Sequence, residues 1–333
     1  MNPDDKIVEK LADHMTLMAW QNAHRRAAMS KGLRPEVLKF NMNETSNLLR
    51  IMDIVGSGRY RPSHYREFYV YEPKKRLILA LPYLDRVVHQ WFVGEFIKPF
   101  YLPRFILDSY ACIPGRGTHA AVDKIQHYMQ IMQERYGHYY VLKMDISKFF
   151  YTIDKSILWR IISARIVDPP LAELAKVMVF DDNGHSGIPI GNYISQYFAN
   201  IYLNELDWYC KRTMNIEFYV RYMDDFVMLA PSRLIARRWY DQIEQFVNKQ
   251  LNLRLNPKSR YYPAKQGLDF VGYRIFSDRL KLRRRAIKKL HQIQRAHRLG
   301  VDDDARYLRR MAAWRGHAQR AIRQYPTNVR MPQ

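Results

Sequence analysis

The sequence predicts an α+β fold in which helices surround short antiparallel strand pairs. Apolar residues recur at helical spacing near both ends of the chain, and apolar, aromatic-rich runs flanking turn residues predict hairpins between them. A third observation is the apolar run at 139–145, which is typical of a buried strand. With 333 residues, the chain can bury a sizeable core in one body with lobes or two to three subdomains.

Local signals then place each element. The first helical pattern has apolar residues at Ile7, Leu11, Met15 and Met18 and ends near Gly32. The predicted elements are helices over 6–30 and 34–60, strands at 67–72 and 76–81, a helix at 84–99, a loop at 113–118, a helix at 119–135, a strand at 139–145, helices over 154–180 and 192–213, a hairpin within 216–229, a helix at 232–250, short strands near 253–276 and a basic helical region over 280–325.

Composition narrows the function classes. Lys and Arg total 54 against 32 Asp and Glu, and the net charge of +22 indicates a polyanionic partner. The surplus is clustered, because residues 279–298 hold nine Lys or Arg and no acid. Aromatic residues make up 14% of the chain, and they supply stacking surfaces for bases as well as core packing.

Cysteine content and the N-terminus indicate a reducing compartment. Cys112 and Cys210 are too few for a structural zinc site or a disulfide framework. The start of the chain lacks the basic and apolar parts of a signal peptide, and no apolar run approaches membrane-spanning length. We therefore expect a protein of the bacterial cytoplasm without a membrane partner.

The most informative motif is Tyr222-Met223-Asp224-Asp225, which places two acids at the tip of a predicted hairpin. Adjacent carboxylates repel each other, and a divalent cation relieves that repulsion. Oxygen-only ligands favour Mg²⁺, with Mn²⁺ as an alternative. Taken alone, the pair is equally compatible with a solvated turn, as expected for Asp181-Asp182.

A third acid, Asp145, ends the predicted strand at 139–145. Together with Asp224 it allows two metal ions to be held about 3.5–4 Å apart for in-line phosphoryl displacement. The alternative is a helix-capping role for Asp145. Three further segments stand out, namely the glycine-opened stretch 187–196, the stretch 253–259 with Lys258 after a strand, and the short apolar turn at 270–273.

In this order and spacing, these segments resemble the palm of reverse transcriptases. The resemblance covers roughly residues 65–275 and implies a right-hand polymerase fold with fingers, a palm of antiparallel sheet and helices, and a helical thumb. The implied division is an N-terminal helical region at 1–60, fingers at 61–135, a palm at 136–275 with a fingers insertion at about 152–188, and a basic helical thumb at 276–333.

The resemblance also implies roles for individual residues. Asp145 and Asp224 would bind both Mg²⁺ ions, with Asp225 as a supporting acid and the Ile146 carbonyl as a further ligand. Lys258 would protonate the leaving pyrophosphate, or is an ordinary exposed lysine. The residues implied to contact the nucleotide or template are Lys74, Arg76, Phe150, Ile190, Gly191, Ser195, Gln196, Tyr222 and Met223.

Three of these assignments have structural alternatives. Phe150 matches the steric gate against a 2′-hydroxyl, but a core aromatic is the alternative. Lys74 and Arg76 are placed to hold the dNTP triphosphate, but either could be a solvated turn cation.

Two motifs indicate a subfamily. Ile190-Gly191 with Ser195-Gln196, and the stretch 111–119, resemble reverse transcriptases of diversity-generating retroelements. The resemblance implies error-prone, adenine-mutagenised cDNA copied from a template-repeat RNA, for retrohoming and protein diversification. It also implies a primer–template, dNTPs and a small, basic, pentameric accessory variability protein as partners.

The sequence leaves alternatives open. An antiphage-defence or group II-like reverse transcriptase without a mutagenic role would carry the same acids. A catalytically idle RNA-binding protein is a third possibility, although it would have no reason to keep repelling carboxylates together. The basic stretch 279–298 fits either a thumb helix along a primer–template or a contact with the accessory protein.

Overall fold

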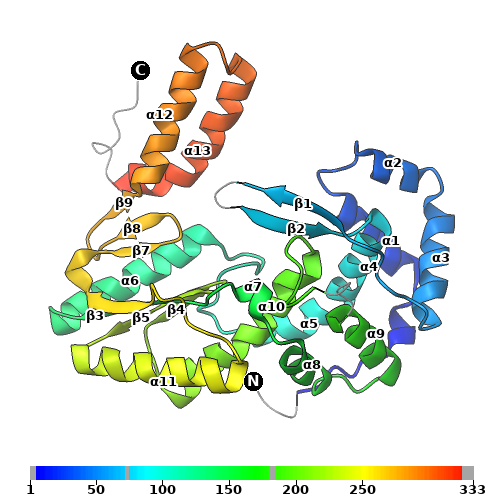
Figure 1. The fold of residues 1–333 in the computed structure, drawn as a ribbon, viewed down its shortest axis with the longest axis horizontal. Helices are drawn as coiled ribbons and strands as arrows, with labels where there is room; N and C mark the ends of the chain where they lie inside the picture. The colour runs from blue at the N-terminus through cyan, green and yellow to red at the C-terminus, as the bar shows by residue number, and fades with distance from the viewer. Residues whose placement is uncertain (1–4, 72–74, 181–184, 325–333) are drawn as a thin grey trace. The chain divides into compact units, whose positions relative to one another are not determined.

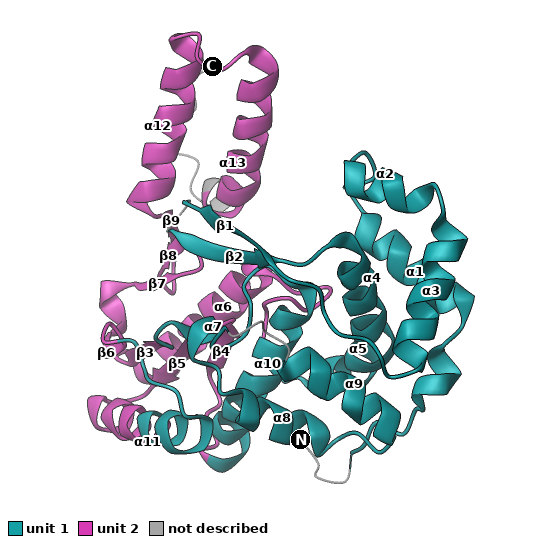
Figure 2. Ribbon diagram, turned by 45° about the vertical axis from the view of Figure 1, so that its right-hand side comes forward, with its two compact units in different colours: residues 1–107, 146–213, 244–256 teal, residues 108–145, 214–243, 257–333 magenta. Residues whose placement is uncertain are grey.

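The computed structural model describes residues 5–71, 75–180 and 185–324. Its strands β1 to β9 pair with one another only in antiparallel fashion. These strands form the pair β1–β2, a four-stranded sheet in the order β4-β5-β3-β6 and a three-stranded sheet in the order β7-β8-β9 (Figure 1). The chain divides into two compact units that each draw on three stretches of sequence (Figure 2). Unit 1 comprises residues 1–107, 146–213 and 244–256, and unit 2 comprises 108–145, 214–243 and 257–333.

Unit 1 is mostly helical. Its elements are the 3₁₀ turn Leu11–His14, α1 (Leu17–Ala28), α2 (Pro35–Asn41), α3 (Glu44–Gly56), β1 (Arg66–Val70), β2 (Arg76–Ala80), α4 (Tyr83–Phe92), a π-helical turn (Val93–Ile97), α5 (Lys98–Tyr101), the 3₁₀ turn Leu102–Arg104, α7 (Phe149–Thr152), α8 (Lys155–Ser163), α9 (Pro169–Phe180), α10 (Tyr193–Trp208) and a π-helical turn (Tyr209–Thr213). The C-terminal part of α11 (Arg233–Leu251) also belongs to this unit.

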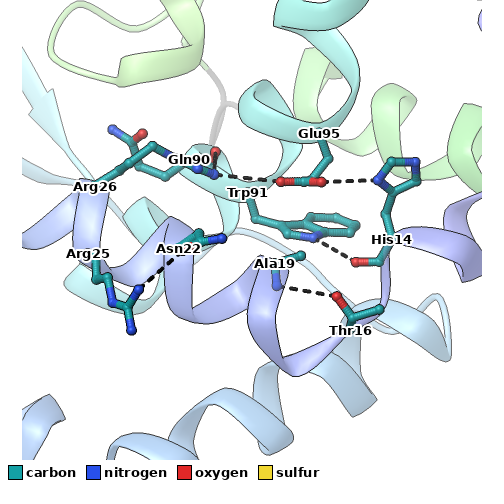
Figure 3. A network of polar contacts seen from close by, with 9 residues as sticks. All are labelled: His14, Thr16, Ala19, Asn22, Arg25, Arg26, Gln90, Trp91 and Glu95. Atoms are coloured by element: carbon teal, nitrogen blue, oxygen red, sulfur yellow. Dashed lines mark hydrogen bonds and ion pairs between the residues drawn. The ribbon is translucent and has the colours of Figure 1, made fainter.

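The packing of α1 against α4 forms the core of the N-terminal part of unit 1. The indole rings of Trp20 and Trp91 stack with centroids 4.4 Å apart. Figure 3 shows the hydrogen bond that Trp91 Nε1 donates to the His14 carbonyl. Glu95, in the π-helical turn after α4, lies 3.1 Å from His14 Nδ1 and 3.8 Å from Arg26 Nη2. One carboxylate thus ties α1 and the segment before it to the end of α4.

The predicted single helix over 34–60 is wrong, because α2 and α3 are separate. Asn43 leaves the helical region with φ −136° and ψ 45°, and it occupies the N-cap position that asparagine favours. The Asn47 side chain donates to the carbonyl of Phe40 at 3.0 Å, which satisfies an acceptor at the end of α2. An apolar pattern that continues across such a break hides it from sequence reasoning.

Unit 2 combines two sheets with helices. Its elements are α6 (Thr118–Tyr136), β3 (Tyr140–Asp145), β4 (Tyr219–Tyr222), β5 (Asp225–Ala230), the N-terminal part of α11, β6 (Arg260–Pro263), the 3₁₀ turn Ala264–Gln266, β7 (Leu268–Phe270), β8 (Tyr273–Ile275), β9 (Leu280–Leu282), α12 (Arg284–Arg298) and α13 (Asp304–Gln324). Buried residues of α6, including Val122, Ile125 and Met129, pack with Val141 and Val227 of the sheet in one hydrophobic core.

The C-terminal region differs from the predicted continuous helical stretch over 280–325. Residues 280–282 form strand β9, whose alternation of a buried, an exposed and a half-buried residue has the period of two that strands require. α12 and α13 then lie side by side as a helical hairpin in both views (Figures 1 and 2). Their small core contains Leu290, Ile293 and Trp314. No helix among the described residues is both long and apolar enough to cross a membrane.

Candidate active site

Two of the predicted acids face each other across the central pair of strands in unit 2. Asp145 is the last residue of β3 and Asp225 the first of β5, and the antiparallel register pairs them directly. Residues paired in this way have Cβ atoms roughly 4.5–5.5 Å apart. The strands therefore bring Asp145, which is 80 positions away in sequence, next to the Asp224-Asp225 pair.

The third acid, Asp224, lies in the two-residue turn between β4 and β5, with Tyr222 and Asp225 paired across it. Met223 adopts a positive φ of 55°, which is unusual for a residue with a side chain. The guanidinium of Arg221 donates from Nη1 to the Met223 carbonyl at 2.9 Å, and Arg221 is completely buried. A buried cation beneath the turn thus stabilises a strained backbone that presents Asp224.

Lys143 pairs with Asp225. Its Nζ lies 2.5 Å from Asp225 Oδ1, and it precedes Asp145 by two positions on β3, so both side chains lie on the same face of the strand. Burial raises the pKa of the Asp225 carboxyl to about 6, against the opposing effect of the Lys143 ammonium. The neighbouring charges of Asp145 and Asp224 raise this pKa further, as expected where three acids gather.

Strand β6 brings Ser259 and Lys258 towards the end of β3. The Ser259 hydroxyl accepts a hydrogen bond from the Asp145 backbone N–H at 3.1 Å and lies 3.3 Å from the Asp145 carbonyl oxygen. Ser259 therefore fixes the backbone that carries Asp145. Lys258 is exposed in the turn that precedes β6. The acids, Tyr222, Met223 and Lys258 all belong to unit 2.

The other predicted residues that the structure describes lie in unit 1, where Phe150 and the glycine-opened loop are adjacent. Phe150 is half-buried in the short helix α7, and its carbonyl accepts from Ile188 N at 2.8 Å. A Cβ at Gly187, which has φ +71°, would come within 2.1 Å of that same carbonyl oxygen. Glycine is required here because two backbone segments touch.

The same loop continues along β2, the strand that begins at Arg76. The N–H of Leu79 donates to the Ile190 carbonyl at 2.9 Å. Gly191 has φ +118°, and a Cβ there would lie 2.7 Å from Cγ2 of Ile78. Ile190 and Gly191 are thus held against the hairpin β1–β2, while Arg76 is exposed.

Four predicted residues remain. Ser195 and Gln196 are in the first turn of α10, where Ser195 is buried and Gln196 exposed. Ile146 is buried and forms a bridge with Leu255. Lys74 lies outside the described residues.

Sequence reasoning missed three residues that support the acids: Lys143, Arg221 and Ser259. Lys143 and Arg221 did leave a signal, because each is a cation within an otherwise apolar strand. Ser259 gave no such signal in the sequence, because a hydroxyl next to Lys258 is compatible with any turn.

The donor set fits divalent metal ions of the hard type. All three acids offer oxygen, and their mutual repulsion would be relieved by a cation. Among the residues that the structure describes, no group of three or more His, Cys, Asp or Glu has the arrangement of a complete metal site. This is compatible with Mg²⁺, which is commonly bound through one or two carboxylates together with substrate phosphates and water.

Much of this chain is similar in sequence to known proteins. Residues 72–275, well over half of the chain, match the family described as reverse transcriptase (RNA-dependent DNA polymerase). Protein YkfC of Escherichia coli K12 is 25% identical over 293 residues, covering 74% of this chain and 75% of YkfC. The group II intron-encoded protein LtrA of Lactococcus lactis subsp. cremoris is 27% identical over 203 residues, but those cover only 32% of LtrA and 57% of this chain.

A solved structure of telomerase from Candida albicans, in complex with a fragment of telomeric RNA, has a TM-score of 0.50 at 13% identity. The match covers 81% of this chain and 55% of the telomerase chain, so this chain spans about half the length of that protein. The similarity concerns the fold, an α+β right-hand polymerase fold with antiparallel sheets. Because the family match over residues 72–275 covers well over half of the chain, the chain belongs to the reverse transcriptase family of RNA-dependent DNA polymerases.

Proposed function

We propose that the chain is an RNA-directed DNA polymerase that uses Asp145, Asp224 and Asp225 for two-metal phosphoryl transfer. The observation that carries this proposal is the direct pairing of Asp145 with Asp225 across β3 and β5, with Asp224 in the adjoining turn. Two Mg²⁺ ions, when bound, would neutralise the charge that develops on the transferred phosphate. In this proposal the fingers, palm and thumb follow the division expected from the sequence.

Within this proposal, each side chain has a separate task. Asp145 and Asp224 would hold the metal ions together with the Ile146 carbonyl, and Asp225, paired with Lys143, would keep the turn in place. The primer 3′-hydroxyl loses its proton to solvent water, its oxygen forms a bond to the α-phosphorus of the dNTP, and the bond to pyrophosphate breaks. Lys258 supplies the proton that the pyrophosphate takes up.

The nucleotide would be held by the residues that the sequence motifs assign to it. Arg76 and Lys74 bind its triphosphate through charge-assisted hydrogen bonds. Phe150 excludes a 2′-hydroxyl by its bulk, and Ile190 and Gly191 contact the base pair. Support comes from the half-buried position of Phe150 and from the attachment of Ile190 to β2.

The polymerase assignment is tested by primer extension on an RNA template with Mg²⁺ and dNTPs. Asp224→Asn should lower kcat by at least about 100-fold, because the metal loses a charged ligand. Asp241→Asn, on the exposed face of α11, is the matched control and should leave kcat unchanged. Equal incorporation by the Asp224→Asn variant and the wild type would refute the proposed chemistry.

The finer proposal is that this enzyme serves a diversity-generating retroelement and miscopies template adenines. Its support is the Ile190-Gly191 and Ser195-Gln196 pattern together with the stretch 111–119. A polar residue at position 190 could hydrogen-bond a correct pair better than a mispair. Isoleucine offers only apolar contact, so the binding energies of a correct pair and a mispair differ less. The partners would be a template-repeat RNA and a basic, pentameric accessory variability protein.

Substitution of Ile190 tests the mutagenic role. Ile190→Gln should lower misincorporation opposite template adenine several-fold, while the size-matched Ile190→Leu should retain it. Sequencing of cDNA from one template provides the measurement, and unchanged error rates in Ile190→Gln would contradict the account.

A group II-like or antiphage-defence reverse transcriptase without a mutagenic role is the second candidate. The similarity to LtrA, whose name describes it as encoded by a group II intron, favours it. The DNA that flanks the gene distinguishes the two candidates. A near-identical repeat pair that differs mainly at adenines would support the diversity-generating retroelement.

A further inference from the structure

The loop before α10, at residues 185–192, is held between two parts of unit 1. On one side, the Ile188 N–H donates to the Phe150 carbonyl of α7 at 2.8 Å. On the other side, the Leu79 N–H of β2 donates to the Ile190 carbonyl at 2.9 Å. These backbone contacts hold the middle of the loop, so the contacts at its two ends decide how firmly it is fixed.

Asn192 ends the loop and occupies the N-cap position of α10. Its backbone is extended, with φ −88° and ψ 142°, a conformation in which an asparagine side chain normally accepts from an N–H of the first helical turn. In the described part of the chain, its side chain makes no such bond to α10. Instead, its Nδ2 donates to the hydroxyl of Tyr65 at 3.3 Å, 127 positions away along the chain. This buried side chain thus serves a tertiary contact and not its own helix.

The partner of Asn192 belongs to the start of the hairpin β1–β2. Tyr65 directly precedes β1, and Glu67 lies within it. At the other end of the loop, the ring of His185 meets the Tyr65 ring edge-on, with centroids 6.3 Å apart, and its Nε2 lies 3.1 Å from Glu67 Oε1. The start of β1 therefore contacts both ends of the loop that carries Ile190.

The contact between Asn192 and Tyr65 is part of a buried polar cluster. Both residues line a hollow of about 10 Å³, together with His89 of α4 and Ser195 of α10. A hollow of this size admits a single water molecule. His89, Asn192 and Ser195 are all buried, so their polar atoms need hydrogen-bond partners within the protein. Such a cluster specifies one arrangement of the elements around it more strictly than a surface contact does.

We propose that Asn192 and Tyr65 are positioning residues for nucleotide selection. Their hydrogen bond fixes the end of the loop, so that Ile190 and Gly191 keep one position against β2. A loop held only at its middle would accommodate a wider range of base-pair shapes, and the correct pair would lose most of the advantage. The role in nucleotide selection rests on the proposed function, whereas the holding of the loop does not.

Two substitutions remove this hydrogen bond from either side. Tyr65→Phe removes one oxygen and leaves the ring that meets His185. Asn192→Ala removes the amide, and it should cost α10 less than at an ordinary N-cap because this side chain does not cap the helix. Tyr136→Phe, at an exposed position of α6, is the matched control. Tm values of all variants establish that they fold.

Hydrogen exchange tests whether the bond holds the loop. In the peptide that contains Ile188, Tyr65→Phe and Asn192→Ala should each speed amide exchange about threefold, since each removes one hydrogen bond. The double variant should exchange no faster than the faster single variant, because both changes remove the same contact. Unchanged exchange in both single variants, or single effects that multiply in the double variant, would overturn the proposal.

Single-nucleotide incorporation opposite a template adenine tests the role in selection. The discrimination is the ratio of kcat/KM for dTTP to kcat/KM for dATP. Tyr65→Phe should lower it about threefold by raising KM for dTTP, with kcat within about twofold of wild type. Tyr136→Phe should leave it unchanged.

The two measurements separate the possible failures. Faster exchange or a lower Tm with unaltered discrimination would show that the contact is merely structural and would overturn the role in selection. Absence of incorporation by the wild type would overturn the polymerase assignment, and the role in selection with it. The exchange result would still decide whether the bond between Asn192 and Tyr65 holds the loop.

Discussion

At the residue scale, Arg221 connects folding with the candidate chemistry. Its backbone N–H donates to the Asp108 carbonyl, its carbonyl accepts from Tyr110 N, and its side chain holds the Met223 carbonyl. Arginine is rarely fully buried unless its charge is paired, so the complete burial of Arg221 beneath the turn needs an explanation. The contact with Met223 gives one, because the positive φ of that residue needs support.

We therefore expect Arg221→Met to act on both stability and turnover. Removal of the donor leaves the Met223 carbonyl without this partner and should lower the free energy of unfolding by about 1–3 kcal/mol. A displaced Asp224 should lower kcat at saturating dNTP more than it raises KM, and should raise the Mg²⁺ concentration for half-maximal rate. Arg237→Met, at an exposed position of α11, serves as the control. A variant with reduced stability but an unchanged Mg²⁺ requirement would show that Arg221 does not position the turn.

His89 makes a second prediction at the residue scale. Burial within α4 lowers its pKa from 6.5 to about 4. Below pH 6.5 the unfolded chain takes up a proton that the folded chain refuses, so His89 makes folding progressively less favourable as pH falls from about 6.5 to about 4. The loss over this range should be about 3 kcal/mol.

Urea unfolding at pH 7, 6, 5 and 4 measures this effect. His89→Gln should remove that part of the pH dependence, whatever its effect at pH 7. His138→Gln, at an exposed position, should retain the wild-type profile. Parallel profiles for wild type and His89→Gln would contradict the assigned role.

At the element scale, sequence reasoning succeeded where one short pattern fixes one element. Apolar runs identified β3 and the hairpin that became β4 and β5, and the motif order identified their acids. It failed at the break between α2 and α3 and at β9, where local signals are weak and long-range pairing decides. The register that places Asp145 opposite Asp225 depends on pairing across 80 positions, which no local pattern encodes.

The loop that ends at Gly191 gives a prediction at this scale. Gly191→Ala would place a methyl group against Ile78 at a φ that side chains rarely adopt, so we expect a loss of about 1–3 kcal/mol in the free energy of unfolding. Displacement of the loop from β2 should also raise KM for dNTP. Gly32→Ala, where a Cβ meets nothing within 4 Å, should be neutral by both measures.

At the scale of the whole molecule, the net charge of +22 is not spread evenly. On α12, Arg284, Lys288 and Arg295 are exposed and fall within about 40° of one another around the helix axis. Leu290 and Ile293 face away from them into the small core shared with α13. This basic stripe leaves open the two uses expected from the sequence, a nucleic-acid backbone or an accessory protein.

The salt dependence of binding decides between these uses. If the stripe contacts phosphates, replacing its three cations with Gln should reduce the slope of log Kobs against log salt by about 2–3, because each lost contact releases one fewer counterion. Anisotropy titrations of an RNA–DNA duplex between 50 and 300 mM salt measure the slope, and Arg233→Gln/Arg237→Gln/Arg238→Gln on α11 is the control for an equal loss of charge. An unchanged slope in the α12 variant would exclude the duplex as its ligand, since counterion release follows phosphate contacts and not net charge alone.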